Sequence, residues 1–437
     1  MNAISAPKNE KPIATRLRDI RGGIVTFITM AYILAVNPAI LSAAGIPRED
    51  IFFATCVSSA VATLLMGLYA RYPFALAPGM GLNAFFAYTV CLANKVPWQT
   101  ALSAVLLSGI LFVILSITGL RKRFLEAVPK DLGFAIAGGI GLFIAFIGLQ
   151  HAQLVVKSDA TMVTLGKLQS KEALIAFAGL SATIVMVSAK IRGAVLLGMA
   201  VATTLAIIFG LGDAPAHLIA IPHIPKESIG AALSGVPHLA SMQMIPIVFT
   251  MLFVDMFDTM GTLLALGHTS GRIDTEGRLP RANRAFVCDA AGTVTGALLG
   301  TSTVTTYIES GAGIVDGART GLASVVTGVL FLLSLFLFPL FAAIPTVATA
   351  PALIVVGALM FGQASHINWK RKPIAISAAL TILSMPVTYS ISTGIGIGFI
   401  TFSLGTLAEK RRLSVPAAVI SLLFVIYFVV QAISFNA

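Results

Sequence analysis

The chain has little charge, few cysteines and few histidines. Asp, Glu, Lys and Arg make up only 11% of its 437 residues, whereas hydrophobic residues make up 57%. The three cysteines are scattered in or near apolar segments, so they predict neither a disulfide framework nor a metal site. None of the six histidines lies centrally in an apolar segment, which argues against a buried imidazole relay. We therefore expect no metal and no organic cofactor.

Long apolar runs fill the sequence instead. A run of about 20 apolar residues lets a helix cross a bilayer, and this chain has many such runs. An all-α polytopic membrane protein is therefore expected. We predict fourteen spanning segments in two sets of seven: 22–43, 51–70, 73–93, 98–119, 124–149, 172–189 and 193–211, then 245–267, 282–299, 301–317, 320–343, 346–362, 373–389 and 391–408. The apolar stretch 415–434 fits either a fifteenth span or a helix at the membrane interface.

The basic residues support this count. The net charge of +11 does not indicate nucleic-acid binding, because Lys and Arg cluster at the ends of apolar segments, as cytoplasmic loops of membrane proteins do. With the N-terminus in the cytoplasm, all but six of the 29 basic residues fall inside; the exceptions are Arg48, Lys95, Lys157, Lys167, Lys171 and Lys226. The N-terminal region is basic and shows no cleavable signal peptide. We expect a bacterial inner-membrane protein with no nucleic-acid partner.

The two sets of seven look related. Both third segments are rich in Gly and Pro or broken by polar residues: RYPFALAPGMGLNAFFAYTV and GTSTVTTYIESGAGIVDG. Both fifth segments open alike, with AVPKDLGFAIAGG and AIPTVATAPALIV. An odd number of spans per set inserts the second set in the opposite orientation, which gives an inverted repeat. Interrupted segments at matching positions of such repeats mark a binding site near the bilayer midplane.

Four carboxylates lie in apolar or Gly-rich stretches: Asp255, Asp258, Asp289 and Glu309. A carboxylate in hydrocarbon is costly, so each is expected to face a protein-walled or watery cavity and to bind or relay something. Asp255 and Asp258 are three residues apart and share a helix face, with Thr259 one turn from Asp255. Two carboxylates on one face cannot both ionise easily, which leaves a proton available for coupling. The alternative is that one Asp caps a helix or pairs with an Arg.

The first interrupted segment contains PFALAPGMGLNAFF. Its start is β-permissive, and Pro78 and Gly79 can open a half-helix whose free N–H groups face a ligand. Asn83 lies about one turn inside and can donate and accept hydrogen bonds. The alternative is that the glycines and Asn83 serve close helix packing.

The second interrupted segment contains TTYIESGAG. A Thr-rich, strand-like run precedes Glu309, so a ligand could meet this carboxylate together with the backbone N–H groups of Ser310 and Gly311. The alternative for Glu309 is an ion pair used in assembly. Asp289 could hydrogen-bond this segment, in a supporting or a direct role.

Carboxylates, an amide and free N–H groups, without a ring of Arg or Lys, suit a ligand rich in N–H donors that also has acceptors. A purine nucleobase fits, with Phe85 or Tyr307 offering an aromatic face. An inorganic anion fits poorly.

These residues resemble the azaguanine-type (AzgA-like) purine permease branch of the nucleobase–cation symporter-2 superfamily, the relatives of xanthine and uracil permeases. The resemblance covers residues from about 16 to about 410 and rests on TFITMAYILAVNPAIL, ALAPGMGLNAFFAYTV, FVDMFDTMGTL and GTSTVTTYIESGAGIVDGARTGL. It implies homodimers that import adenine, guanine or hypoxanthine with protons, by an elevator-like movement. It also implies a core domain (22–119 and 245–343) and a gate domain (120–211 and 344–408), beside a cytoplasmic tail (1–21), an extracellular or periplasmic loop (212–244) and a C-terminal basic turn with an extra apolar segment (409–437).

The resemblance also assigns roles to residues. Asn83 matches the family's Asn in segment 3, Asp255 and Asp258 its acids in segment 8, Asp289 an acid in segment 9, and Glu309 its Glu in segment 10. The substrate-binding candidates are Asn83, Asp258, Glu309, Gly79, Phe85, Ser310 and Thr29. The proton-coupling candidates are Asp255, Asp258 and Glu309. Asp289 and Thr259 are expected to support them, Thr259 standing near a position where uracil-type relatives carry His.

Three other functions are less consistent with the sequence. A sulfate-type anion exchanger shares this fold, but it usually carries a C-terminal cytoplasmic domain, for which we expect no room here, and it would not favour so many acids. A channel should show a continuous polar face, whereas the polar residues here concentrate at two interrupted segments. An enzyme is not indicated either, because the sequence shows no nucleophile–base pair.

Overall fold

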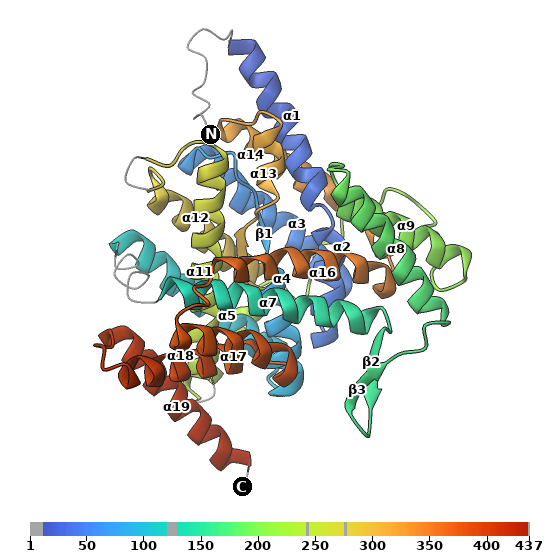
Figure 1. Ribbon diagram of the computed structural model, residues 1–437. Coiled ribbons are helices and arrows are strands. Elements are labelled where there is room, and N and C mark those ends of the chain that lie inside the picture. The colour runs from blue at the N-terminus through green and yellow to red at the C-terminus, as the bar shows by residue number, and fades with distance from the viewer. Residues whose placement is uncertain (1–11, 120–128, 242–243, 275–277, 436–437) are drawn as a thin grey trace.

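The computed structural model describes residues 12–119, 129–241, 244–274 and 278–435, and these form a largely helical assembly (Figure 1). Some predicted features lie outside the described residues: the tail 1–11 with Lys8 and Lys11, the start of the fifth segment (124–128), and Arg121, Lys122 and Arg123.

Every predicted segment of the first set contains at least one helix. Its elements are α1 (Pro12–Met30), α2 (Ile33–Leu41), α3 (Arg48–Leu65) with a π-helical turn (Met66–Ala70), β1 (Leu76–Pro78), α4 (Met80–Ala84) with the π-helical stretch η3 (Phe85–Ala93), α5 (Trp98–Thr118), α7 (Lys130–His151), α8 (Lys171–Ser188) and α9 (Ala194–Ile208). The second set is α11 (Met244–Thr269), α12 (Ala282–Leu299), β4 (Val304–Thr306), α13 (Ser310–Val315), α14 (Gly321–Leu333) continued by α15 (Phe338–Ala342), α16 (Thr346–Phe361), α17 (Lys372–Thr388) and α18 (Ile391–Ala408).

The predicted fold class is confirmed. In the described residues, nine helices are long and apolar enough to cross a membrane, and four shorter apolar helices accompany them. The two segments predicted to be interrupted each contain a short β-strand followed by a helix. The number of fourteen crossings remains a prediction.

Several boundaries differ from the sequence-based expectation. Helix α1 begins at Pro12, well before residue 22, and proline is favoured at the first position of a helix. An antiparallel hairpin of β2 (Val155–Ser158) and β3 (Met162–Leu165) follows α7 and was not predicted. The loop 212–242 contains the short helix α10 (Ala231–Ser234). The stretch 415–434 is a helix, α19 (Val415–Phe435), which is compatible with both alternatives.

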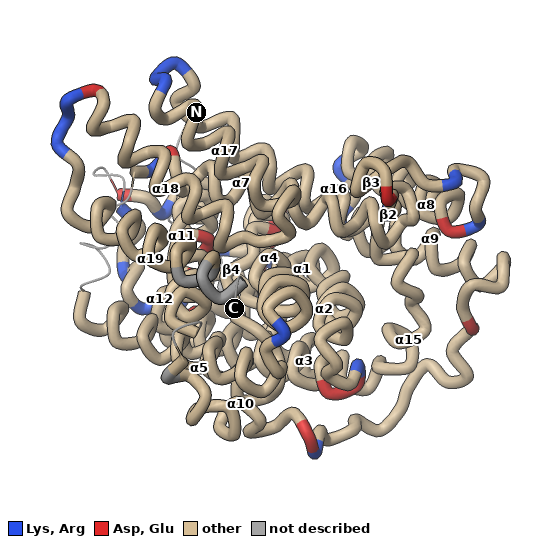
Figure 2. Tube along the Cα trace, turned by 90° about the horizontal axis from the view of Figure 1, so that it is seen from below, with Lys and Arg blue, Asp and Glu red and all other residues tan. Residues whose placement is uncertain are grey.

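The helices pack in two groups. In one group, α12 packs on α3 and α5, and α14 packs on α1 and α3. In the other, α7 packs on α16 and α17, α8 on α9 and α16, and α17 on α18. Figure 2 shows the second group along one side, with α7, α16 and α17 together and α8 and α9 beyond them. The predicted core and gate domains remain expectations, and this grouping is consistent with them.

Segments at matching positions of the two sets lie together. The third segments meet where β1 pairs with β4, and the fifth segments meet where α7 packs along α16. Glycines allow the second contact, since a Cβ added at Gly141 would lie 2.5 Å from the carbonyl oxygen of Gly357. This pairing of equivalent elements is what an inverted repeat predicts.

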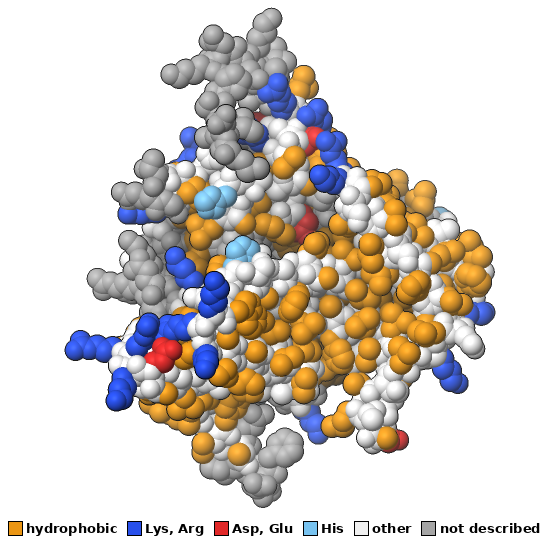
Figure 3. All heavy atoms as spheres, viewed as in Figure 1, with side chains coloured by type: hydrophobic (Ala, Val, Ile, Leu, Met, Phe, Trp, Pro, Cys, Tyr) orange, Lys and Arg blue, Asp and Glu red, His pale blue; other side chains and the backbone are white. Residues whose placement is uncertain are grey.

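The outer surface suits a bilayer. Figure 3 shows hydrophobic side chains over the middle of one face, with Lys and Arg gathered near the N-terminal end and along an edge. Exposed apolar residues of α8, α14 and α17 include Phe177, Val185, Val329, Leu333, Ile376 and Leu383. In water such a surface would be unfavourable, whereas lipid covers it without cost.

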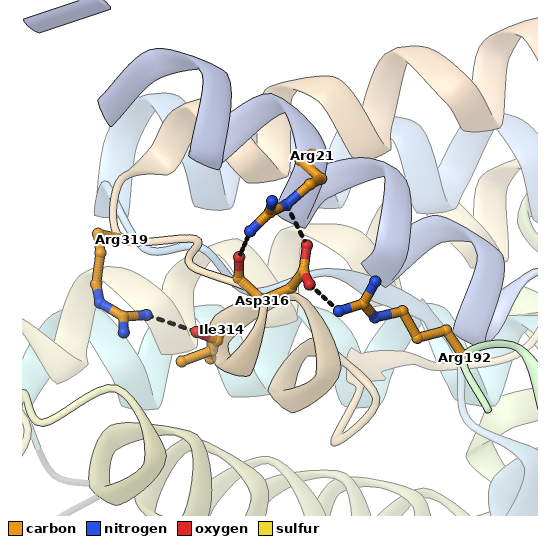
Figure 4. A network of polar contacts seen from close by, with 5 residues as sticks. All are labelled: Arg21, Arg192, Ile314, Asp316 and Arg319. Carbon is orange, nitrogen blue, oxygen red and sulfur yellow. Dashed lines mark hydrogen bonds and ion pairs between the residues drawn. The ribbon is translucent and has the colours of Figure 1, made fainter. Parts of the chain in front are cut away.

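One ion-pair network connects the two groups of helices (Figure 4). Asp316 follows α13 and is almost fully buried, with its side chain 4% exposed. Its carboxylate binds Arg21 of α1 at 2.6 Å and also Arg192 from the turn between α8 and α9. Arg192 thus ties the second interrupted segment to the other group.

Candidate functional site

The site lies where the two interrupted segments cross. Strands β1 and β4 pair antiparallel, with Leu76 opposite Thr306 and Pro78 opposite Val304. Directly after each strand a helix begins, α4 at Met80 and α13 at Ser310. The Pro78–Gly79 pair therefore ends a strand and opens a half-helix as predicted, and the Thr-rich run contains the strand expected before Glu309.

In the described structure, the Asn83 side chain is hydrogen-bonded through its oxygen and not through its nitrogen. It is 0% exposed, and its side-chain oxygen accepts a hydrogen bond from the Ser302 hydroxyl. Its amide nitrogen is buried and has no hydrogen-bond partner in the part of the chain that the structure describes. An unsatisfied buried donor costs about 1–3 kcal/mol, so an acceptor placed beside Asn83 would be bound favourably.

Glu309 precedes α13 and remains partly exposed. One of its carboxylate oxygens accepts a hydrogen bond from the Tyr32 hydroxyl at 2.6 Å. Thr29 lies nearby, with its hydroxyl 3.5 Å from the Glu309 carbonyl oxygen and 2.8 Å from its own helix partner, the Thr26 carbonyl. Tyr32 sits in the break between α1 and α2, and sequence reasoning missed it.

The two aspartates of α11 have different surroundings. Asp255 is 1% exposed and accepts a hydrogen bond from Thr293 of α12 at 2.9 Å. Asp258 is partly exposed and accepts one from Thr305 of β4 at 3.2 Å. Asp258 also lies within electrostatic reach of Glu309. Asp258 is therefore the partly exposed aspartate of the pair and is held directly by β4, whereas Asp255 is buried against α12.

Asp289 connects three elements. It is 0% exposed and accepts hydrogen bonds from Thr259 of α11 at 2.7 Å and from Thr306 of β4 at 2.9 Å. Thr259 lies 3.0 Å from Thr305 of the same strand. The expected hydrogen bond between Asp289 and the second interrupted segment is confirmed, and Thr259 lies in the same network.

Three expected features of the site are not found. The N–H groups of Ser310 and Gly311 are not free, because they donate to the carbonyls of Tyr307 and Ile308 at 3.2 and 2.9 Å in the turn that opens α13. The Gly79 N–H donates to the Thr303 carbonyl at 3.0 Å, since strand pairing extends that far. Phe85 is 0% exposed and offers no open face, because protein packs around it. That these residues contact substrate stays a prediction.

Other positions in the described residues do not add to this site. A hollow of about 690 Å³ lies elsewhere, at the ends of α7 and α16, and no candidate residue lines it; its walls include Gln150, His151, Lys167 and Glu172. In the described ranges, no group of three or more His, Cys, Asp and Glu side chains is placed to hold a metal ion. The expectation that no cofactor is bound remains a prediction.

Comparison with known proteins decides the family. Residues 18–397 match the Permease family that is named for xanthine and uracil permeases. The chain belongs to this family. It is 48% identical to a putative permease of Methanocaldococcus jannaschii over 87% of both chains. It is 42% identical to a guanine/hypoxanthine permease of Bacillus subtilis, over 94% of this chain and 96% of that one. An adenine permease of Escherichia coli is 37% identical, over 95% and 93%.

The resemblance to the azaguanine-type branch is thereby confirmed, and the chain is a multi-pass membrane permease rather than an enzyme. Solved structures support the fold. The transmembrane domain of the cyanobacterial bicarbonate transporter BicA matches with a TM-score of 0.64 at 16% identity, over 89% of this permease and 99% of that domain. At this identity the likeness concerns the fold alone.

Proposed function

We propose that this permease imports a purine nucleobase, namely adenine, guanine or hypoxanthine, by proton symport. One observation carries the proposal: of the four intramembrane carboxylates, Asp258 and Glu309 are partly exposed and both adjoin β4, Asp258 through its hydrogen bond with Thr305 and Glu309 through the chain, whereas Asp255 and Asp289 are buried. A purine presents N–H edges to carboxylates and ring nitrogens to a donor such as the Asn83 amide. The names of the bacterial relatives, guanine/hypoxanthine and adenine permeases, support the same substrate class.

The mechanism we propose follows from the placement of these groups. Asp258 and Glu309 hold the N–H edge of the base, and Asn83 donates to a ring nitrogen from the opposite segment. Protonation of the aspartate cluster accompanies substrate entry, because closely spaced carboxylates in a low dielectric cannot all be ionised. The interrupted segments then move with one group of helices against the other, in an elevator-type exchange of access within a homodimer. The grouping of the helices supports this movement.

An anion exchanger is the second candidate, because the bicarbonate transporter shares the fold. Carboxylates at the crossing repel an anion, and among the described candidate residues no Arg or Lys offsets them. Only the shared fold therefore supports an anion exchanger.

Uptake into proteoliposomes tests the proposal. Radiolabelled adenine, guanine, hypoxanthine, xanthine and uracil are offered with and without an inward proton gradient. Saturable purine uptake that rises with the gradient, and that is lost in Glu309→Ala and Asp258→Ala, is the expected result. Uptake of sulfate or bicarbonate, or of no nucleobase, would refute the proposal.

A further inference from the structure

Three oxygen–oxygen contacts in a row link Asp258 to Asp289. The Asp258 carboxylate lies 3.2 Å from the Thr305 hydroxyl, Thr305 lies 3.0 Å from the Thr259 hydroxyl, and Thr259 lies 2.7 Å from the Asp289 carboxylate. The path thus runs from the partly exposed carboxylate at the crossing to a fully buried one. Asp255 is outside this row, since its partner is Thr293.

The number of hydrogens decides how this row works. Each threonine hydroxyl carries one hydrogen and can donate once. Three contacts need three hydrogens, and the two hydroxyls supply only two. If both aspartates were ionised, Thr305 would donate to Asp258 and Thr259 to Asp289, leaving two hydroxyl oxygens 3.0 Å apart with no hydrogen between them. If both were protonated, the row would use only one of the two acidic hydrogens, and the other would have to lie on a carboxyl oxygen outside the row. The row is satisfied when the two carboxyl groups hold one proton between them.

We propose that Thr259 is a positioning residue through which Asp258 and Asp289 share a single proton, with Thr305 as the second link. In one state, protonated Asp258 donates to Thr305, Thr305 to Thr259, and Thr259 to ionised Asp289. When each donor passes its hydrogen along, Asp258 becomes a carboxylate, Asp289 becomes a carboxylic acid, and both hydroxyls still carry one hydrogen. The coupled proton is thereby stored on Asp289, away from the substrate, while Asp258 is freed to accept an N–H from it.

This proposal rests on the proposed proton symport and extends it by naming where the proton is held. Other ionisable groups also act on the pair electrostatically, and they come from α11, α12, the residue after β4 and the start of α13: Asp255, Cys288, Tyr307 and Glu309. Thr306 donates to the second oxygen of Asp289 without belonging to the row, so it provides a matched control.

The test compares Thr259→Val, Thr259→Ser and Thr306→Val in the full-length protein in proteoliposomes. Removing a positioned proton-transfer group typically costs about 100-fold or more. We expect proton-driven adenine or hypoxanthine uptake to fall about 100-fold in Thr259→Val, while exchange of substrate across a membrane without a proton gradient falls far less. Thr259→Ser keeps the hydroxyl and should restore coupling, and Thr306→Val should remain coupled. Equal behaviour of Thr259→Val and Thr306→Val would show that Asp289 is only a structural brace.

Infrared spectroscopy separates this proposal from the transport proposal. A protonated carboxyl group absorbs at a different infrared frequency from an ionised one, and this measurement needs no substrate. We expect one such band to disappear in both Asp258→Asn and Asp289→Asn and to persist in Asp255→Asn. Persistence of every band in Asp258→Asn and Asp289→Asn would overturn the shared proton, whatever the transport result. Absence of purine uptake with the expected bands would refute the proposed function alone.

Discussion

The two interrupted segments have the same plan and different chemistry. Each is a short strand that turns into a half-helix, and the strands pair with one another. The first segment is closed: Asn83 and Phe85 are 0% exposed, and a Cβ added at Gly79 or Gly81 would overlap the side chain of Thr305 or Ile140. The second is more open only around Glu309: this residue is partly exposed, and a Cβ added at Gly311 would have only Leu266 nearby, at 3.7 Å, whereas Gly313 farther along α13 is packed closely against α1. The comparison teaches that the first segment supplies a fixed wall and the second the adaptable, charged side of the site.

The strongest way to break this comparison is to enlarge a glycine in each half-helix. A Cβ at Gly81 would lie 2.3 Å from the Cγ2 of Ile140 on α7. That methyl cannot swing away, because a β-branched side chain in a helix is stiff at χ1. Overpacking of this kind costs about 1–3 kcal/mol. We expect Gly81→Ala to reduce uptake and melting temperature strongly, and Gly311→Ala to leave both near the values of the unmodified protein.

A second substitution checks the cause. Ile140→Ala removes the methyl that an alanine at position 81 would strike, so the double variant should transport better than Gly81→Ala alone. Normal uptake by Gly81→Ala would mean that the first segment is not the fixed wall described above.

The fold was predictable from the sequence to a large extent, and the site only in part. The breaks at Pro78–Gly79 and before Glu309 are local, because Pro, Gly and Thr-rich runs act on the backbone at their own position. Tyr32 and Ser302 were missed, since each finds its partner at a distance in sequence of 277 and 219 residues. The expectation of a free N–H group at Ser310 was wrong, because the turn that opens α13 itself uses this group as a hydrogen-bond donor. A local sequence pattern does not encode the long-range contacts of Tyr32 and Ser302.

Ser302 offers the next test of the closed segment. Its hydroxyl is the donor that holds the Asn83 side-chain oxygen. In Ser302→Ala that buried oxygen would lose this donor while the Asn83 amide nitrogen already lacks a partner, at a cost of about 1–3 kcal/mol. We expect a lower melting temperature, and a partial recovery when adenine or hypoxanthine is added, because a bound base satisfies the amide. A melting temperature equal to that of the unmodified protein would indicate that Ser302 does not hold Asn83.

Two tyrosines sharpen the contrast between wall and charged side. Tyr32 donates to the Glu309 carboxylate at 2.6 Å, and Tyr307 donates to the Pro78 carbonyl at 2.5 Å. A hydrogen bond to a charged group is worth about 1.5–3 kcal/mol, and water reaching the partly exposed Glu309 offsets part of its loss. We expect Tyr32→Phe to change the KM for purine several-fold with little change in melting temperature. Tyr307→Phe loosens the strand pair, so it should lower the melting temperature. Reversed outcomes would exchange the two roles.

The smallest effects concern how each segment is tied to the other helix group. The first is tied by a neutral bond, from the Thr89 hydroxyl to the Tyr389 carbonyl at 2.8 Å. The second is tied by the ion pair of Asp316 with Arg192, whose side chain is 61% exposed. Asp316 is buried, but water and salt reach the exposed Arg192 side chain, so this half-exposed pair is partly screened by salt. Arg192→Ala should therefore lower the melting temperature slightly at low ionic strength and less at about 1 M salt, whereas the effect of Thr89→Val should not depend on salt. Arg21 still binds Asp316 in Arg192→Ala. A large loss of melting temperature in that variant would therefore mean that the pair of Asp316 with Arg192 does more than connect this segment to the other helix group.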